Sequence, residues 1–351
     1  MRAGFGAGQT VRMGNMADVA AAAGVSISTV SHVINETRRV DPRTRDAVLA
    51  AIAATGYRRN ALAAALATSR SGVLALSIAA GRNPYFGPLM RAIESRASEL
   101  GYTLMMGDSH DDTDIEHRLV GSLLDRRVDG LIMAPSPGSE ERTIPTVRAA
   151  GTPLVLIDRL SPADVDQVAS EGAEPVVRLT SHLAELGHRR IGVLTGRPGI
   201  QCTEERIEGF VRAMDAAGLR AAPRHVLCGD SRADEAHVQT LAMFRARAPR
   251  PTGLVVLNNE MTVGAMRALR ELDLRVPEDV ALVAYDDFEW SDLFSPGLTA
   301  AAQDVEAIGR RCVDLLVERI AGYDGARRVE RLPTAFHHRD SCGCERPRAG
   351  G

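Results

Sequence analysis

From residue 73 onward, short apolar runs alternate with longer amphipathic stretches. The runs are VLALSIA, YTLMMGD, DGLIMAP, PLVLID, RIGVLTG, HVLCGD, GLVVLN and VALVAYD. Between them lie segments with helical periodicity, such as MRAIESRASELG, TEERIEGFVRAMDAAG and TVGAMRALRELD. Short buried runs that alternate with helices predict parallel sheets with helices on both faces. Roughly 270 residues of this pattern exceed one comfortable sheet, so we expect two α/β lobes.

The first 70 residues follow a different, helical pattern. Small or apolar residues stand at the relative spacings 0, +4, +10 and +13, at Ala20, Gly24, Val30 and Val33. In a helix-turn-helix the first position must be small because the second helix crosses it. Glycine permits the turn, and the two valines pack back on the first helix. The spacing therefore predicts a small all-α helix-turn-helix domain.

Capping residues support the same prediction. Ser26 is placed to cap the second helix. A third helix is predicted to begin with Asp41 as its cap and Pro42 in its first position, and to end at Gly56.

The second helix is predicted to present a polar face. With Val30 and Val33 inward, Ser28, Thr29 and His32 face outward from its N-terminal half, the part that contacts base edges in the major groove of DNA. Residues 1–70 carry nine Arg and four acidic residues, a net charge of +5, whereas the remainder carries −8. A basic head on an acidic body is expected where only the head meets a polyanion. An ordinary helical hairpin is the alternative, but the whole pattern favours DNA binding.

Composition sets further bounds on this chain of 351 residues. Apolar residues make up 45% and charged residues 25%, as in ordinary globular proteins. No apolar run approaches the roughly 18 residues that cross a bilayer. Residues 1–15 lack the apolar segment of a secretion signal, and we expect them to be a disordered extension. Five cysteines spread over a long chain fit a reducing compartment, so we expect a cytoplasmic protein with no membrane partner.

The head resembles the LacI/GalR family of bacterial transcription regulators. The match runs almost residue by residue from MADVAAAAGVSISTVSHVINETRRV to NALAAALAT, and VSHVINETRRV is most similar to purine-responsive members. The resemblance implies a set of DNA-binding residues: Ile27, Ser28 and His32 on bases, Thr29 and Ser31 on the backbone, with Asn35 and Asn60 in the same set.

The segment NALAAALA, residues 60–67, favours helix but is too short to be stable alone in water. One interpretation is a frayed linker. The resemblance implies instead a hinge helix that folds only on DNA, beside its two-fold mate, with Leu66 wedged into a minor-groove base step.

The resemblance continues along the body, through NPYFGPLMRAIE, RRVDGLIMAPS, LGHRRIGVLTG and LRVPEDVALVAYDD. It implies a two-lobed fold like the periplasmic sugar-binding proteins, with three chain crossings between lobes. The expected limits are 16–59 for the helix-turn-helix domain, 60–71 for hinge and linker, 72–341 for the effector-binding and dimerisation body, and 342–351 for a tail. Within the body we expect lobe 1 at about 72–160 and 304–322, and lobe 2 at about 161–303 and 323–341.

Ligands in such folds lie at the carboxyl ends of strands, here between the lobes. Asp286 ends the run VALVAYD, where its carboxylate could accept hydrogen bonds from two hydroxyls of a polyol. By resemblance, Arg206 reaches into the cleft, and its planar guanidinium suits hydroxyls or a carboxylate. The other candidates are the family's Asn-Asp pair and nearby rings, here Asn259, Glu260, Tyr85, Phe86 and Trp290. Burial in the core is the competing interpretation for the rings.

Head and cleft favour different effectors. The base contacts of purine-responsive members fall on Ile200, Cys202 and Ser231, which cannot reproduce a purine site. The segment ASEGAEPVV also departs from the Asp-Asn and Gly-Ala usual there. We expect a sugar or related polyol, with a purine or another metabolite as the alternative.

Metal and enzyme chemistry are not favoured. The motif HHRDSCGC holds His337, His338, Cys342 and Cys344, which are zinc-ligand types. Its CxC spacing is not a standard zinc spacing, and family members commonly end in Arg-x-Ser-Cys, so no metal site is expected. No GxxxxGK[ST] loop and no nucleophile–base set stands out. We expect no catalytic residues and no cofactor.

These patterns predict a homodimeric repressor that binds a palindromic operator and whose DNA affinity is set by a small effector. A solute-binding protein would share the body, but it should carry a secretion signal and lack the basic head. Activation instead of repression stays open at this point.

Replacement of Leu66 by alanine tests the hinge hypothesis. Wedging costs a few kcal/mol, which added contacts to the bent DNA recover. Leu66→Ala should therefore weaken operator binding far more than non-specific binding, as measured by fluorescence anisotropy on both duplexes. Equal losses on the two DNAs would contradict the wedge.

Overall fold

The computed structural model describes residues 14–35, 38–57, 70–79, 81, 83–247 and 249–344. The chain divides into two compact units, residues 1–71 and 72–351, here named the head and the body. The predicted hinge residues Asn60 and Leu66 lie outside the described residues, as does the side chain of Asn35.

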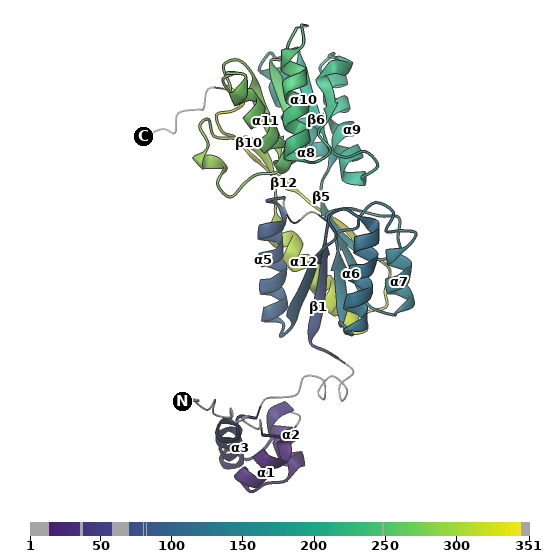
Figure 1. Ribbon diagram of the computed structural model, residues 1–351, viewed down its shortest axis with the longest axis vertical. Coiled ribbons are helices and arrows are strands. Elements are labelled where there is room, and N and C mark those ends of the chain that lie inside the picture. The colour runs from purple at the N-terminus through teal and green to yellow at the C-terminus, as the bar shows by residue number, and fades with distance from the viewer. Residues whose placement is uncertain are drawn as a thin grey trace, which may run out of the picture. The chain divides into compact units, whose positions relative to one another are not determined.

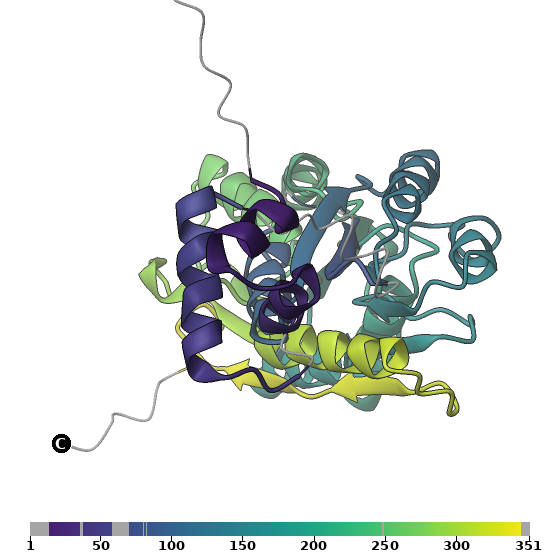
Figure 2. The same cartoon turned by 90° about the horizontal axis from the view of Figure 1, so that it is seen from below.

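The head consists of three short helices, drawn in purple in Figures 1 and 2: α1 (Met16–Ala23), α2 (Ile27–Asn35) and α3 (Pro42–Thr55). Their shared core is Val19, Ala20, Val30, Val33, Val48 and Ala51, all buried. The three helices therefore bury the residues that the spacing pattern turned inward, and the predicted helix-turn-helix is confirmed.

Side-chain caps fix the ends of these helices. The backbone N–H of Thr29 donates to Ser26 Oγ over 3.1 Å, and Asp41 Oδ2 accepts from the N–H of Arg43 over 3.0 Å, so both predicted caps are confirmed. Asn15 was assigned to a disordered extension, and that assignment is wrong. Its side chain accepts from the N–H of Asp18 over 3.0 Å, while Asp18 accepts from its backbone N–H, which forms a capping box for α1.

Lobe 1 of the body is built on one parallel sheet in the order β11-β5-β4-β3-β1-β2. Its strands are β1 (Val73–Ile78), β2 (Thr103–Asp108), β3 (Gly130–Met133), β4 (Leu154–Ile157), β5 (Asp166–Ser170) and β11 (Val329–Leu332). The helices around it are α5 (Phe86–Glu99), α6 (Thr113–Asp125), α7 (Thr143–Ala149) and α12 (Val305–Ile320). Helix α12 packs against α5 and against β3, β4 and β5, while α6 packs against α7.

Lobe 2 repeats this plan with a sheet in the order β12-β10-β9-β8-β6-β7. Its strands are β6 (Ile191–Thr195), β7 (Val226–Cys228), β8 (Gly253–Val256), β9 (Ala281–Tyr285), β10 (Thr299–Gln303) and β12 (Thr334–His337). Only β12 runs antiparallel to its neighbour among the described strands. The helices are α8 (Ala173–Glu185), α9 (Gln201–Ala216), α10 (Ala233–Arg245) and α11 (Asn259–Glu271), with 3₁₀ turns η1 (Pro223–His225) and η2 (Ser291–Leu293). Two parallel-rich α/β lobes confirm the predicted fold class.

The chain crosses between lobes three times, between β5 and α8, between β10 and α12, and between β11 and β12. The predicted limits placed residues 161–170 and 323–332 in lobe 2, and the structure corrects both, because β5 and β11 belong to the lobe 1 sheet. Cys342, assigned to the tail, is fully buried in the core of lobe 2.

A buried aspartate explains why β5 stays in lobe 1. The Asp166 carboxylate accepts from Arg319 Nε and Nη2, both over 2.8 Å, and from Arg328 Nη2 over 2.9 Å. Burial raises the pKa of Asp166, but these arginine hydrogen bonds outweigh it and lower the pKa to about 2. The carboxylate joins the start of β5 to α12 and to the residue before β11.

Within the described residues no single helix is long and apolar enough to cross a membrane, although the bent pair of α1 and α2 could do so by length and composition alone.

Two helical glycines allow a matched test of packing. A Cβ on Gly209 of α9 would overlap the carbonyl oxygen of Ala173 at the start of α8, whereas a Cβ on Gly121 of α6 would meet nothing within 4 Å. Gly209→Ala should therefore lower the free energy of unfolding by about 1–3 kcal/mol through overpacking. Gly121→Ala should raise it by up to about 1 kcal/mol through helix propensity. Urea titration of both variants measures the difference, and equal effects would contradict this account of the α8–α9 contact.

Candidate effector cleft and DNA-contacting helix

A cleft of about 1200 Å³ lies between the two lobes of the body. Loops that follow the carboxyl ends of parallel strands line it from both sides, as expected for α/β sheets. Lobe 1 contributes the segments after β1, β2 and β4, and lobe 2 contributes those after β6, β7, β8 and β9, together with the start of α9.

Corresponding strands in the two lobes end in the same backbone conformation. Asp158 follows β4 with a φ of 70°, and Asp286 follows β9 with a φ of 74°. Positive φ angles also occur at Asp111, in the loop after β2, and at Asp230, after β7, with values of 58° and 50°. This left-handed region costs free energy for any residue other than glycine, although Asp tolerates it better than most. Such strain gathers at functional sites, and all four aspartates line the cleft.

Arg206 is the buried cation of the cleft. Its guanidinium lies over the Tyr285 ring, 3.7 Å from the centroid, and its Nη1 donates to the Leu257 carbonyl over 2.7 Å. Burial lowers its pKa, but Tyr285, Cys202, Asp286 and Asp158 act in the opposite sense and raise it overall, so the guanidinium stays charged. Among the described residues, no acceptor lies within hydrogen-bond reach of its buried Nε. A donor of this kind is available to a polar ligand.

Two carboxyl groups, Asp158 from lobe 1 and Asp286 from lobe 2, interact electrostatically with the Arg206 guanidinium. Burial raises the pKa of Asp286, which Arg206 and a hydrogen bond from Gln303 Nε2 over 2.6 Å counteract. Burial likewise raises the pKa of Asp158, against the charges of Arg159 and Arg206. Burial thus raises the pKa of both carboxyl groups, and the neighbouring arginines oppose this effect. Both groups offer acceptor oxygens to the cleft.

Two other arginines of the cleft are paired with carboxylates. Arg159 Nη2 donates to Asp111 over 3.1 Å, and Arg197 Nε donates to Asp230 over 3.1 Å. These two pairs neutralise charge within each lobe.

The predicted cleft residues divide into two groups. Those that line the cleft are Tyr85, Phe86, Arg206, Glu260 and Asp286. The other two lie elsewhere, which corrects their assignment. Asn259 is buried at the start of α11 and leaves the lining position to Asn258, and Trp290 is partly exposed, stacked at 4.5 Å between ring centroids on Phe288.

Asp158 is a cleft residue that sequence reasoning missed, although the available signal was the one that identified Asp286. It ends the predicted strand PLVLID as Asp286 ends VALVAYD. The rings of Tyr85 and Phe86 meet edge to face, with centroids 5.2 Å apart, and both are nearly fully buried. Burial raises the pKa of Tyr85 well above its ordinary value, with the Asp158 and Asp286 charges adding to the effect.

Helix α2 presents its first residues to solvent. Ile27 is 50% exposed, and Ser28 is also exposed. Ser31 and His32 are partly exposed on the same helix. Thr29 is only half exposed, and its hydroxyl hydrogen-bonds Ser26 Oγ over 2.8 Å, so its side chain is engaged with the cap of α2. Among the described members of the predicted DNA-binding set, Ile27 and Ser28 are thus the most accessible.

Comparisons with known proteins agree with this division. Residues 15–60 match the model of the bacterial regulatory proteins of the lacI family, and residues 180–342 match a periplasmic binding protein-like domain. The HTH-type transcriptional repressor PurR of Aliivibrio salmonicida is 32% identical over 318 residues, which cover 90% of this chain and 95% of that protein. PurR of Haemophilus influenzae (strain PittEE) is 32% identical over 321 residues, covering 91% and 95%.

Solved structures show the same relationship. The lac repressor dimer bound to operator and the anti-inducer ONPF has a TM-score of 0.84 and 28% identity, covering 94% of this chain and 99% of that chain. The complex of the transcriptional regulator CelR with cellobiose has a TM-score of 0.70 and 29% identity, covering 93% and 99%. Because the similarity to these regulators runs over nearly the full length of the chain, the chain belongs to the LacI family of DNA-binding transcription regulators.

Proposed function

We propose that this LacI-family repressor acts as a homodimer on a two-fold symmetric operator and that a sugar or related polyol in its cleft controls the binding. The observation that carries the effector assignment is the pair of cleft carboxylates, Asp158 and the buried Asp286, supplied by different lobes around Arg206. The family is one of regulators, and no enzymatic role is proposed.

The lining chemistry favours a neutral polyol. Vicinal hydroxyls donate to carboxylate oxygens and accept from a guanidinium, which is the combination that Asp158, Asp286 and Arg206 offer. Ile200, Cys202 and Ser231 also line the cleft. Burial raises the pKa of Cys202, so its thiol stays neutral, and Ser231 Oγ accepts from the Arg197 N–H over 3.1 Å. None of the three supplies a ring or an amide that would pair with a purine base.

A purine effector is the second candidate. The observation in its favour is that the two relatives above, about one-third identical over nine-tenths of the chain, are named PurR. In contrast, one structural neighbour was solved with cellobiose. The competing names make the ligand a matter for direct measurement.

The control mechanism follows from the position of the cleft. A ligand that touches both aspartates contacts both lobes, so it favours the lobe arrangement in which both reach it. Direct contacts between the lobes already exist, since Arg331 Nη1 donates to Glu205 over 2.8 Å and the Leu160 N–H donates to Gln201 Oε1 over 3.4 Å. A ligand that changes the balance of these contacts changes DNA affinity by no more than its differential affinity for the two arrangements.

DNA binding is assigned to the exposed start of α2 on a basic head. The lac repressor neighbour was solved as a dimer on its operator. A dimer of this chain would place two such helices on successive half-sites of a near-palindrome.

The effector proposal predicts the result of a thermal-shift screen on the full chain against sugars, sugar phosphates and purines. A ligand at about 100 times its Kd stabilises the folded state by about 2.7 kcal/mol. Asp286→Asn and Asp158→Asn should each weaken a polyol roughly 10- to 150-fold, because a charge-assisted hydrogen bond contributes about 1.5–3 kcal/mol.

Asp273→Asn is the matched control, since Asp273 is an exposed aspartate with a positive φ of 55° outside the cleft, and it should bind as the wild type does. A purine hit, or a sugar hit that both cleft variants leave intact, would overturn the polyol assignment.

The DNA proposal predicts selection of a dyad-symmetric sequence from random duplexes. His32→Ala should weaken that site about 5- to 150-fold, because a base contact contributes about 1–3 kcal/mol of discrimination. The substitution should leave the affinity for unselected DNA unchanged. In both proteins that affinity should fall steeply as the salt concentration rises. Electrophoretic shift measures both, and a parallel loss on unselected DNA would assign His32 to the phosphate backbone.

A further inference from the structure

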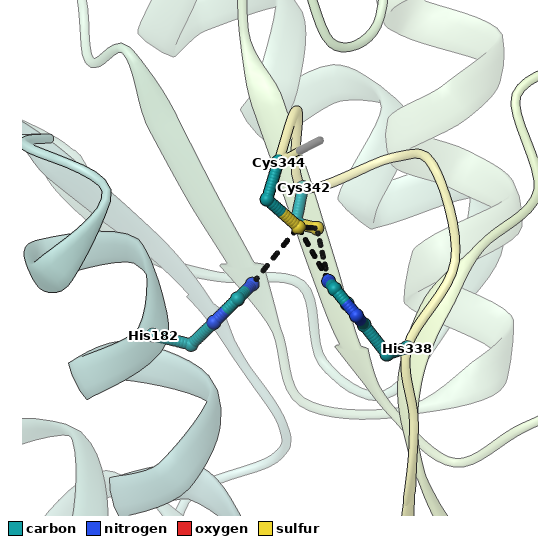
Figure 3. A group of neighbouring side chains, drawn as sticks. All are labelled: His182, His338, Cys342 and Cys344. Carbon is teal, nitrogen blue, oxygen red and sulfur yellow. Dashed lines mark hydrogen bonds between the residues drawn. The ribbon is translucent and has the colours of Figure 1, made fainter. Parts of the chain in front are cut away.

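Two histidines and two cysteines meet on lobe 2, away from the residues that line the cleft. They are His182 near the end of α8, His338 directly after β12, and Cys342 and Cys344 in the turn that follows (Figure 3). One ligand atom from each, an imidazole nitrogen or a sulfur, lies within 4.8 Å of all the others. Figure 3 shows the two imidazole rings approaching the two sulfurs from different elements.

The distances suit a small tetrahedral ion after a slight expansion. Cys342 Sγ lies 3.4 Å from His338 Nε2, and Cys344 Sγ lies 3.7 Å from His182 Nε2. Cys344 Sγ also contacts His338 Nε2, and the two sulfurs are 2.8 Å apart. Zn–S bonds of about 2.3 Å and Zn–N bonds of about 2.0–2.1 Å at tetrahedral angles require sulfur–nitrogen edges of about 3.5 Å and a sulfur–sulfur edge of about 3.8 Å. Two of the sulfur–nitrogen edges match, whereas the sulfurs need to separate by about 1 Å and Cys344 Sγ must also move away from His338 Nε2.

Hydrogen bonds of Ser341 and Gly343 hold the cysteine turn in place. Ser341 Oγ accepts from the Thr299 N–H over 2.8 Å and donates to the Leu282 carbonyl over 2.6 Å. Gly343 has a φ of 80°, a conformation that suits glycine, and its N–H donates to the Asp340 carbonyl over 3.0 Å. The turn therefore directs Cys342 and Cys344 to the same side before any ion binds.

The cluster of His182, His338, Cys342 and Cys344 is buried on one side and accessible to solvent on the other. Cys342 is fully buried, Cys344 and His182 are partly exposed, and His338 is exposed, which leaves an entry path for an ion.

We propose that His182, His338, Cys342 and Cys344 bind one zinc ion in a closed structural site. Two thiolates and two imidazoles are a donor set that selects zinc among common cellular divalent cations. With four protein ligands no position is left open for catalysis. The ion joins the chain that follows β12 to α8, the helix that begins directly after the first lobe crossing.

The CxC motif gave no standard zinc spacing because it supplies only part of the site. His182 lies 162 residues before Cys344 and comes from a helix. The neighbouring His337 is not a member, since its Nδ1 pairs with Asp287 Oδ2 over 2.6 Å. The chain thus offers two adjacent histidines with different predicted roles.

The test uses the full chain purified with reductant and without added chelator. Elemental analysis should find one zinc per chain, and the metal-free chain should bind one cobalt ion with the intense visible bands of tetrahedral sulfur coordination. Cys344→Ser, His338→Ala and His182→Ala should each lose most of the bound zinc and the cobalt bands. His337→Ala and Cys228→Ser, a cysteine that hydrogen-bonds the Gly196 carbonyl elsewhere, should keep both.

Circular dichroism checks that each variant is folded. Absence of zinc together with no cobalt spectrum in the reduced chain would overturn the proposal. A Cys342–Cys344 disulfide that forms while the reduced chain binds no metal would do the same and would assign the cluster to redox chemistry. Equal loss of zinc from His337→Ala and His338→Ala would contradict this ligand set.

Discussion

The cleft depends on one constraint, which is that a charged guanidinium is buried where the two lobes meet. Arg206 has the Tyr285 ring and the Leu257 carbonyl as close partners, and these cannot balance a full charge in a low-dielectric site. Asp286 and Asp158, which come from different lobes, are among the groups that raise the pKa of Arg206. The electrostatic environment of Arg206 therefore depends on how the two lobes are arranged. A ligand that binds among these groups acts directly on the arrangement of the lobes.

This arrangement also explains the strained strand ends. An aspartate that follows a buried parallel strand with ordinary extended backbone would continue in the strand direction. The positive φ at Asp158 and Asp286 turns the chain at the carboxyl end of the sheet, and both carboxylates line the cleft. The free energy stored there is small beside the two large lobe cores, which the aliphatic strands and flanking helices build independently of the site.

Sequence reasoning succeeded where side-chain chemistry is local. All eight aliphatic runs are strands, and the helix caps Ser26 and Asp41 are placed as their residue types predict. It failed at β5 and β11, with sequences DQVAS and VERL, because short runs with polar or charged residues become strand only through pairing with neighbours far along the chain. The misplaced lobe limits follow from that failure. Trp290 was misassigned because closeness in sequence to Asp286 does not fix the direction of a ring.

The histidine–cysteine cluster shows the same limit more sharply. HHRDSCGC contains three of the four grouped side chains, but no local rule separates His338 from His337, and His182 is on a helix of ordinary amphipathic pattern. The pairing of β12 with β10 decides the outcome, because it fixes where His338 and the following turn lie relative to α8. Strand β12 follows the third lobe crossing and α8 follows the first, so the cluster lies on two of the segments through which the lobes are connected. A bond between those segments would make lobe 2 stiffer without touching the effector, which separates the stability of the body from the chemistry of its cleft.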